Sequence, residues 1–179
     1  MAWRTRESRT VYENRWIHVR EDQVSGPHGD GIYGVVRMQH PAVFVVAMDG
    51  EDRVCLVGLE RYTTGWSWEV PAGGSDGDEP LAAAQRELLE ETGLQAAEWT
   101  PLGTMHALNG IADAPEHVFL ARGLTATADA AWTQHEEGID EVVWVPFAEA
   151  LAMVADGRIS DGETIAALAY AGIHLGRFT

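Results

Sequence analysis

Residues Gly73–Leu94 read GGSDGDEPLAAAQRELLEETGL, a loop rich in glycine and aspartate that leads straight into the strongest helix signal of the chain. Pro80 suits the first turn of a helix, and Gly93 suits the position just beyond a helix end. The stretch therefore predicts a helix over residues 80–92, entered from a tight polar loop.

The predicted helix has two unlike faces at about 100° per residue. One face is apolar and comprises Leu81, Ala84 and Leu88. The opposite face carries three carboxylates, those of Glu87, Glu90 and Glu91. Like charges at i and i+4 destabilise a helix by about 0.2–0.5 kcal/mol per pair, so this face needs solvent, a cationic side chain or a metal ion. Arg86 can offset one charge by reaching Glu90.

The second half of this stretch resembles the box of the Nudix hydrolase family, Arg-Glu-apolar-any-Glu-Glu-any-Gly-apolar. Arg86, Glu87, Glu90, Glu91 and Gly93 hold the required residue types at the required spacing. In the first half, the count back from Arg86 places Asp78 where the family has Glu and Ala72 where it has Gly. We interpret Asp78 as a structural residue that caps the helix. The resemblance implies an α+β fold, a Nudix-type α/β/α sandwich with a mixed β-sheet.

The rest of the chain is consistent with this fold class, because runs of strands precede and follow the helix instead of alternating regularly with helices. Strands are predicted at 16–20, 32–38, 42–48, 54–59, 66–70, 100–106, 117–123 and 139–145, and further helices at 147–156 and 162–170. Ser160 to Glu163 is interpreted as a capping box for the last helix. We divide the chain into N-terminal strands at 1–40, a predicted dimerisation region, and a Nudix hydrolase domain at 41–179.

Composition excludes several classes of function. The chain has 179 residues with 12 Lys and Arg against 28 Asp and Glu, a formal net charge of −16. This charge repels nucleic acid phosphates, so no nucleic acid partner is expected. The longest apolar run, residues 41–48, is far shorter than the roughly 20 residues of a membrane helix. We expect no membrane partner and a cytoplasmic protein, and Cys55 as a buried thiol.

The carboxylate face suits a divalent cation, because Mg²⁺ prefers oxygen ligands and keeps several waters and substrate phosphates. Glu87 and Glu91 are the first choices as ligands. By the resemblance, Glu91 bridges two ions and is catalytic, Glu90 adds a ligand or positions one, and the carbonyl of Ala72 completes the shell. Arg86 belongs to the catalytic set by orienting carboxylates. The expected cofactor is Mg²⁺, with Mn²⁺ as an alternative.

Four further residues are candidates for catalysis or substrate binding. The resemblance implies a general base on a loop before the last strand, where Glu137 aligns best and Glu136 second. Arg61 suits a diphosphate clamp, because its planar fork binds phosphate bidentately. Trp16 is favoured for stacking a base, ahead of Tyr33, Trp66 and Trp68. Glu69 is assigned to substrate contacts, with strand packing as the alternative.

Beyond the box, the chain looks like the branch of the family that acts on ADP-ribose and related ADP-sugars. The segments that suggest this branch are Val11–Trp16, Glu60–Tyr62, Trp68–Gly73 and Ile159–Leu168. The resemblance implies a small-molecule nucleotide substrate, hydrolysis of its diphosphate to AMP and a sugar phosphate, and a homodimer. Four alternatives remain. The substrate could be another nucleotide-sugar, a dinucleoside polyphosphate or an oxidised nucleotide, or the protein could be a nucleotide-binding regulatory module without catalysis.

Overall fold

The computed structural model describes residues 2–127 and 137–178 of the chain. In this part, the elements follow one another as β1 (Arg4–Glu13), β2 (Ile17–Gly26), β3 (Gly29–Met38), β4 (Ala42–Ala47), β5 (Arg53–Arg61), β6 (Gly65–Glu69), β7 (Ala72–Gly74), α1 (Pro80–Thr92), β8 (Leu94–Met105), β9 (Ala112–Asp113), β10 (Glu116–Ala126), β11 (Ile139–Pro146), α3 (Phe147–Asp156) and α4 (Gly162–His174). The predicted strands and helices are all present. The additional elements β1, β7 and β9 were not predicted.

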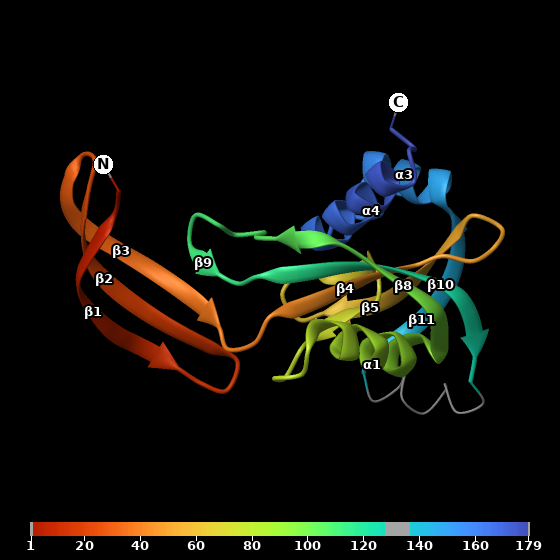
Figure 1. Cartoon of the computed structure of the whole chain (residues 1–179), viewed down its shortest axis with the longest axis horizontal. Coiled ribbons are helices and arrows are strands. Elements are labelled where there is room, and N and C mark those ends of the chain that lie inside the picture. The colour runs from red at the N-terminus through yellow and green to blue at the C-terminus, as the bar shows by residue number, and fades with distance from the viewer. Residues whose placement is uncertain (1, 128–136, 179) are drawn as a thin grey trace.

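The body of the molecule is a sandwich of sheets between helices, as predicted. One sheet has the strand order β7-β4-β10-β8, and a second has the order β11-β5-β6. The first sheet is mixed, because β10 runs parallel to β4 and antiparallel to β8. Helix α1 covers one side of these sheets, whereas α3 and α4 cover the other (Figure 1).

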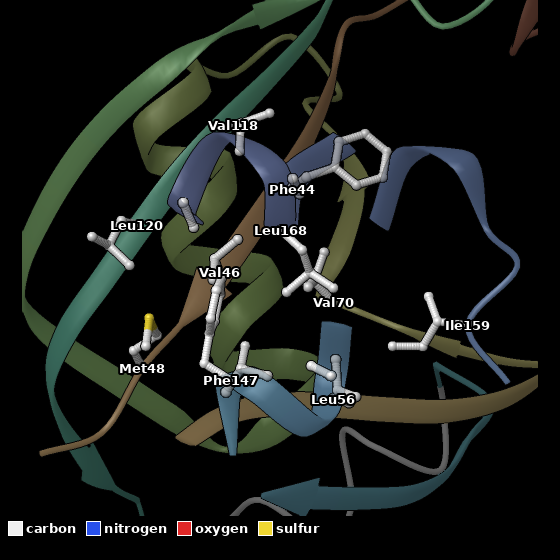
Figure 2. Packing of buried hydrophobic residues seen from close by; sticks show 14 of the residues in the cluster. Phe44, Val46, Met48, Leu56, Val70, Val118, Leu120, Phe147, Ile159 and Leu168 are labelled. Carbon is white, nitrogen blue, oxygen red and sulfur yellow. The ribbon is translucent and has the colours of Figure 1, made fainter. Parts of the chain in front are cut away.

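Strand β4 shows how the sheet builds a core on each face, because successive side chains of a strand point to opposite faces. Val43 and Val45 pack in a cluster with Leu88 of α1. Phe44 and Val46 pack on the other side in a cluster with Leu168 of α4 (Figure 2). The body therefore has two apolar layers, and β4 is buried between them.

The ends of helix α1 are defined by Pro80 and Gly93, as the sequence predicts. Pro80 is the first helical residue, and Gly93 takes the left-handed conformation with φ 69° and donates its N–H to the carbonyl of Leu89. The predicted cap at Asp78 is wrong. The N-cap is Glu79, whose side chain makes no capping bond. The Asp78 N–H donates to the Ser75 carbonyl at 2.8 Å and closes the loop before the helix.

Helix α4 begins one residue later than the predicted capping box. Asp161 is the N-cap, and its Oδ2 accepts the N–H of Thr164 at 2.7 Å. Ser160 therefore lies outside the helix. None of the helices in the described residues is long and apolar enough to cross a membrane.

The strands β1, β2 and β3, with the short β9 paired to β3, form a separate sheet that projects from the sandwich (Figure 1). Across one face of this sheet, Tyr12 lies opposite Val19, and Val19 lies opposite Val36. Ile32, on the same face, is 63% exposed, and Tyr12 is 54% exposed. This apolar face is thus exposed at Tyr12 and Ile32 and half-buried at Val19 and Val36. The role of residues 1–40 in dimerisation stays a prediction.

Candidate active site

Helix α1 buries Ala84 and Leu88 of its predicted apolar face, and it also buries two of the three predicted carboxylates. Glu87 and Glu91 are each only 5% exposed, whereas Leu81 is 41% exposed. Glu90 is half-buried at the edge of the same face. The helix is rotated so that two carboxylates face the sheet, and this rotation requires room for them.

The room comes from the short strand β7. A Cβ atom built on Gly73 would lie 2.2 Å from Cδ of Glu87, so only glycine allows the Glu87 carboxyl to occupy this place. The neighbouring residue Ala72 donates its N–H to Oε2 of Glu91 at 2.9 Å. The glycine that this packing requires is thus Gly73, although the count back from Arg86 places Ala72 at the leading glycine of the family pattern.

Arg86 holds the carboxylates from the side. Its Nη1 donates to Oε1 of Glu87 at 2.7 Å and to Oε2 of Glu90 at 2.9 Å, and its Nη2 donates to the Gly74 carbonyl at 2.7 Å. The guanidinium therefore ties helix α1 to the loop that precedes it. Both donating nitrogens are engaged by the protein itself, so Arg86 is a positioning residue in this geometry.

The burial of the two carboxylates favours the binding of a cation. Burial raises the pKa of Glu91 to about 8, the N–H of Ala72 opposes this shift, and the charge of Glu87 adds to it. Burial also raises the pKa of Glu87, despite the adjacent Arg86. Two buried like charges are costly unless a cation compensates them, and carboxylate oxygens are the ligands that Mg²⁺ and Mn²⁺ prefer. The residues present fit a divalent cation.

A divalent cation can bind to these glutamates without a complete set of protein ligands. Within residues 2–127 and 137–178, no three His, Cys, Asp or Glu side chains converge closely enough to enclose a metal ion. Magnesium is commonly held by one or two carboxylates, and water and substrate phosphates complete its shell. The two buried glutamates are sufficient as the carboxylate ligands of such a site.

Arg61 lies at the end of β5 and is fixed by Glu69 at the end of β6. Its Nε donates to Oε1 of Glu69 at 3.0 Å and its Nη2 donates to Oε2 at 2.5 Å, a bidentate pair. Glu69 is 5% exposed, and Arg61 keeps 44% of its side chain accessible. Both carboxylate oxygens of Glu69 are thereby used, so Glu69 positions Arg61 in this geometry.

Glu137 and Trp16, two further candidates from the sequence, lie in different surroundings. Glu137 is exposed in the turn before β11, and beyond the effect of burial its charge raises the pKa of both Glu87 and Glu91. Glu136 lies outside the described residues. Trp16 is 58% exposed at the start of β2, where the guanidinium of Arg15 lies 4.0 Å from its ring centroid.

A cleft of about 500 Å³ runs from β7 to the first turn of α4. Arg61, Ala72 and Gly73 line it together with Trp66, whose ring meets that of Trp68 edge-to-face at 5.6 Å. The aromatic residues that line this cleft are therefore Trp66 and Phe44, and not Trp16 of the same chain. Trp66 was one of the sequence candidates, but periodicity alone could not rank it above the others.

Two acidic residues of the same cleft were missed by sequence reasoning. Asp161 and Glu163 line it at the first turn of α4, and the sequence assigned them to helix capping alone. A third carboxylate, Glu116, is 8% exposed at the start of β10 and was not singled out. A glutamate heading the apolar strand HVFLA was the one available signal.

Comparison with known proteins places the chain in a family. The NUDIX domain model matches residues 38–168, and the model "Nucleoside diphosphate sugar hydrolase N-terminal domain" matches residues 3–36. The chain belongs to the Nudix hydrolase family, whose members typically depend on a divalent metal. It is a pyrophosphatase of nucleoside diphosphates linked to another moiety.

Individual relatives refine this assignment. The chain is 36% identical over 172 residues to an ADP-ribose pyrophosphatase of Mycobacterium tuberculosis, covering 94% of this chain and 80% of that protein. It is 41% identical over 109 residues to a GDP-mannose pyrophosphatase of Yersinia enterocolitica, covering 59% and 56% of the two chains. A solved structure titled "Crystal structure of ADP compounds hydrolase" shares the fold, with TM-score 0.81, 20% identity, and coverage of 99% and 96%. The chain is thus an ADP-ribose pyrophosphatase-like Nudix hydrolase.

Proposed function

We propose that this protein hydrolyses the diphosphate of ADP-ribose or an ADP-sugar and releases AMP and a sugar phosphate. The observation that carries the proposal is the position of two buried carboxylates. Glu91 accepts the N–H of Ala72 and Glu87 lies against Gly73, and these two backbone positions line the same cleft as the half-exposed Arg61. Burial makes the carboxylates demand a cation, and the guanidinium fork matches phosphate oxygens. The full-length similarity to an ADP-ribose pyrophosphatase supports the ADP-ribose assignment.

We assign the metal ligands to Glu87 and Glu91, with Glu90 and the carbonyl of Ala72 as further contributors, and the ion to Mg²⁺ or Mn²⁺. A bound divalent cation supplies charge neutralisation of the diphosphate and a lowered pKa for an attacking water. The protein holds these carboxylates in place by hydrogen bonds. Arg86 does this for two glutamates through bonds of 2.7 and 2.9 Å, and the N–H of Ala72 does it for Glu91.

The other roles follow the chemistry of each side chain. Glu137 accepts the proton of the attacking water as general base, since its exposed carboxylate lies within electrostatic range of the buried pair. Arg61 binds a phosphoryl oxygen, and Glu69 fixes the plane of the guanidinium. Trp66 packs against the apolar face of a base or sugar in the cleft.

We further propose that the protein is a homodimer in which the N-terminal sheets meet. The apolar face with Val19 and Val36, which is exposed at Tyr12 and Ile32, is the surface that a second copy would bury. Trp16 lies in the turn between β1 and β2 of this sheet. Its assignment as a substrate contact therefore applies to the site of the partner subunit, since the cleft of its own chain is lined by Trp66 instead.

The proposal is tested by chromatography of the products from ADP-ribose, ADP-glucose, GDP-mannose and diadenosine tetraphosphate, with and without Mg²⁺. We expect AMP from ADP-ribose or the ADP-sugar, dependent on both Mg²⁺ and Glu91. Faster hydrolysis of GDP-mannose would assign the enzyme to another nucleotide-sugar, an alternative that the GDP-mannose pyrophosphatase similarity favours. Binding without turnover of every substrate would instead identify a regulatory module.

A further inference from the structure

The cleft has an acidic end that the proposed chemistry does not use. Beyond Arg61 and Trp66, it extends to Asp161 and Glu163 at the first turn of α4. A helix N-terminus with free N–H groups is ordinarily a good place for a phosphate. Here the first turn of α4 carries its own carboxylates, which oppose the binding of any further anion.

The position of this acidic end is fixed by buried hydrogen bonds. Thr164 is fully buried, and its hydroxyl accepts the N–H of Val70 at 3.1 Å, which pins α4 to the segment before β7. The N–H of Thr164 in turn donates to Asp161 at 2.7 Å. The carboxylates of the first turn are therefore held at a constant place relative to Glu69 and Ala72, and not on a free loop.

Glu116 adds a buried acceptor at the same place. It is 8% exposed, and its Oε2 has no hydrogen-bond partner among the described residues. It shares a strand face with Val118 and lies opposite Ala42, which lines the cleft. Burial, followed by the charges of Glu163 and Asp161, raises the pKa of Glu116 to about 7. The Glu116 side chain therefore lies next to Ala42 at the cleft, on the face of the sheet that packs against α4.

We propose that Asp161, Glu163 and Glu116 are specificity-determining residues that accept hydrogen bonds from the hydroxyl groups of a sugar and exclude an additional phosphate. Carboxylates accept hydrogen bonds and do not donate them when ionised, whereas sugar hydroxyls are good donors. A third or fourth phosphate is an anion with acceptor oxygens only, so it meets both repulsion and unsatisfied lone pairs. The enzyme therefore selects nucleoside diphosphate sugars over polyphosphates.

This inference rests on the proposed hydrolysis, and it divides the cleft by chemistry. The diphosphate lies toward Arg61 and the buried glutamates of α1, where cations neutralise it. The uncharged sugar lies toward α4. Because the reaction occurs at the first end, a change of charge at the second end alters which substrate is preferred without removing the catalytic groups.

The test compares kcat/KM for a nucleoside diphosphate sugar and for diadenosine tetraphosphate in wild type, Glu163→Gln and Asp161→Asn. The sugar substrate is whichever of ADP-ribose, ADP-glucose and GDP-mannose wild type hydrolyses. Both substitutions keep side-chain size, and asparagine still caps a helix. We expect the sugar-to-polyphosphate ratio of kcat/KM to fall at least about tenfold in each variant, because a lost acceptor leaves a hydroxyl unpaired and the repulsion is reduced.

Glu51→Gln is the matched control, because Glu51 lies on the exposed β4–β5 turn away from the cleft and loses the same charge. It should leave the ratio unchanged. A ratio that also stays unchanged in Glu163→Gln, with wild type active on the sugar substrate, overturns this inference alone. A wild type that hydrolyses no sugar substrate overturns the proposed function and this inference together. Should Asp161→Asn fail to fold, as shown by its melting curve, Glu163→Gln decides the result.

Discussion

Helix α1 with its loop and the N-terminal sheet differ in what surrounds their important side chains. At α1, charged groups are buried and held by named partners, such as Glu91 by the Ala72 N–H and Glu87 by Arg86. On the N-terminal sheet, apolar groups such as Ile32 are exposed. The first region is completed within one chain, whereas we expect the second to be completed by a second copy.

This contrast shows which parts of the molecule tolerate change. Around α1, a substitution acts on one geometric contact, so its effect should be local and should appear in turnover or metal affinity. On the N-terminal sheet, a substitution acts on a surface, so its effect should appear in assembly. Measurements of turnover and metal affinity therefore report on the first region, and measurements of assembly report on the second.

The largest effect is expected from Glu91→Gln. Removal of the buried carboxylate charge should lower kcat by on the order of 10³-fold or more, since the metal contribution to such a reaction is several kcal/mol. Glutamine retains the size of the side chain and needs no cation, so the melting temperature should not fall. Steady-state turnover with Mg²⁺ measures the effect, and full Mg²⁺-dependent activity would refute the assignment of Glu91.

Glu137→Gln should be next in size. Loss of a general base typically costs about 10²–10⁴-fold in rate, with little change in substrate affinity because the residue acts on water. The measurement separates kcat from KM. The control is Glu141→Gln on the exposed part of β11, which should retain the wild-type rate. An unaltered rate in Glu137→Gln would move the base to another residue.

Ile32→Lys tests the other side of the comparison. A charge on the apolar face of the N-terminal sheet should raise the dimer dissociation constant by at least about 100-fold, since each copy loses the burial of an isoleucine. Light scattering across a concentration series gives the result. His28→Lys in the β2–β3 turn carries the same charge outside this face and should remain dimeric. A wild type that is monomeric at working concentration contradicts the dimer itself.

Gly73→Ala and Gly74→Ala form a matched pair within one strand. A Cβ at Gly73 would overlap the Glu87 carboxyl at 2.2 Å, whereas a Cβ at Gly74 meets only Oδ1 of Asp76 at 3.6 Å. The first substitution should displace the carboxyl and weaken Mg²⁺ affinity by about 10- to 100-fold. The second should have no measurable effect. Titration of activity with Mg²⁺ tests both, and equal affinities in the two variants would exclude the glycine contact as the cause.

The smallest effect concerns Glu116 and the pH dependence of stability. Its folded-state pKa of about 7 lies above the ordinary value of 4.5, mainly because of burial and also through Glu163 and Asp161. The native state therefore binds the proton of the Glu116 carboxyl more tightly than the unfolded state does. The stability that this protonated carboxyl provides is present below pH 4.5 and is lost as the pH rises to 7.

Glutamine does not titrate, so Glu116→Gln removes this pH-dependent loss of stability. Relative to wild type, the variant should gain on the order of 2 kcal/mol in free energy of unfolding between pH 4.5 and pH 7. Urea denaturation at several pH values measures the difference. A constant difference across this range would show that Glu116 titrates normally in the folded state.

Prediction from the sequence worked where the signal is local. The glycine and proline at the ends of α1 act on their own backbone, so the limits of that helix were predicted correctly. The strand β1 was missed because Arg4–Glu13 is mostly polar and exposed, and strand pairing with β2 is what orders it. The two-residue β9 was missed because its pairing with β3 depends on a contact between residues distant in the chain.

The sequence by itself determined the family, the order of the body elements and the set of carboxylates on one helix, because these depend on residue type and spacing. Only the tertiary structure decided the rotation of α1, which buries Glu87 and Glu91 against β7. It also decided that Trp66 and Asp161 share a cleft with Arg61. These features arise from packing between segments far apart in the chain, where one absent Cβ, at Gly73, decides which side chain fits.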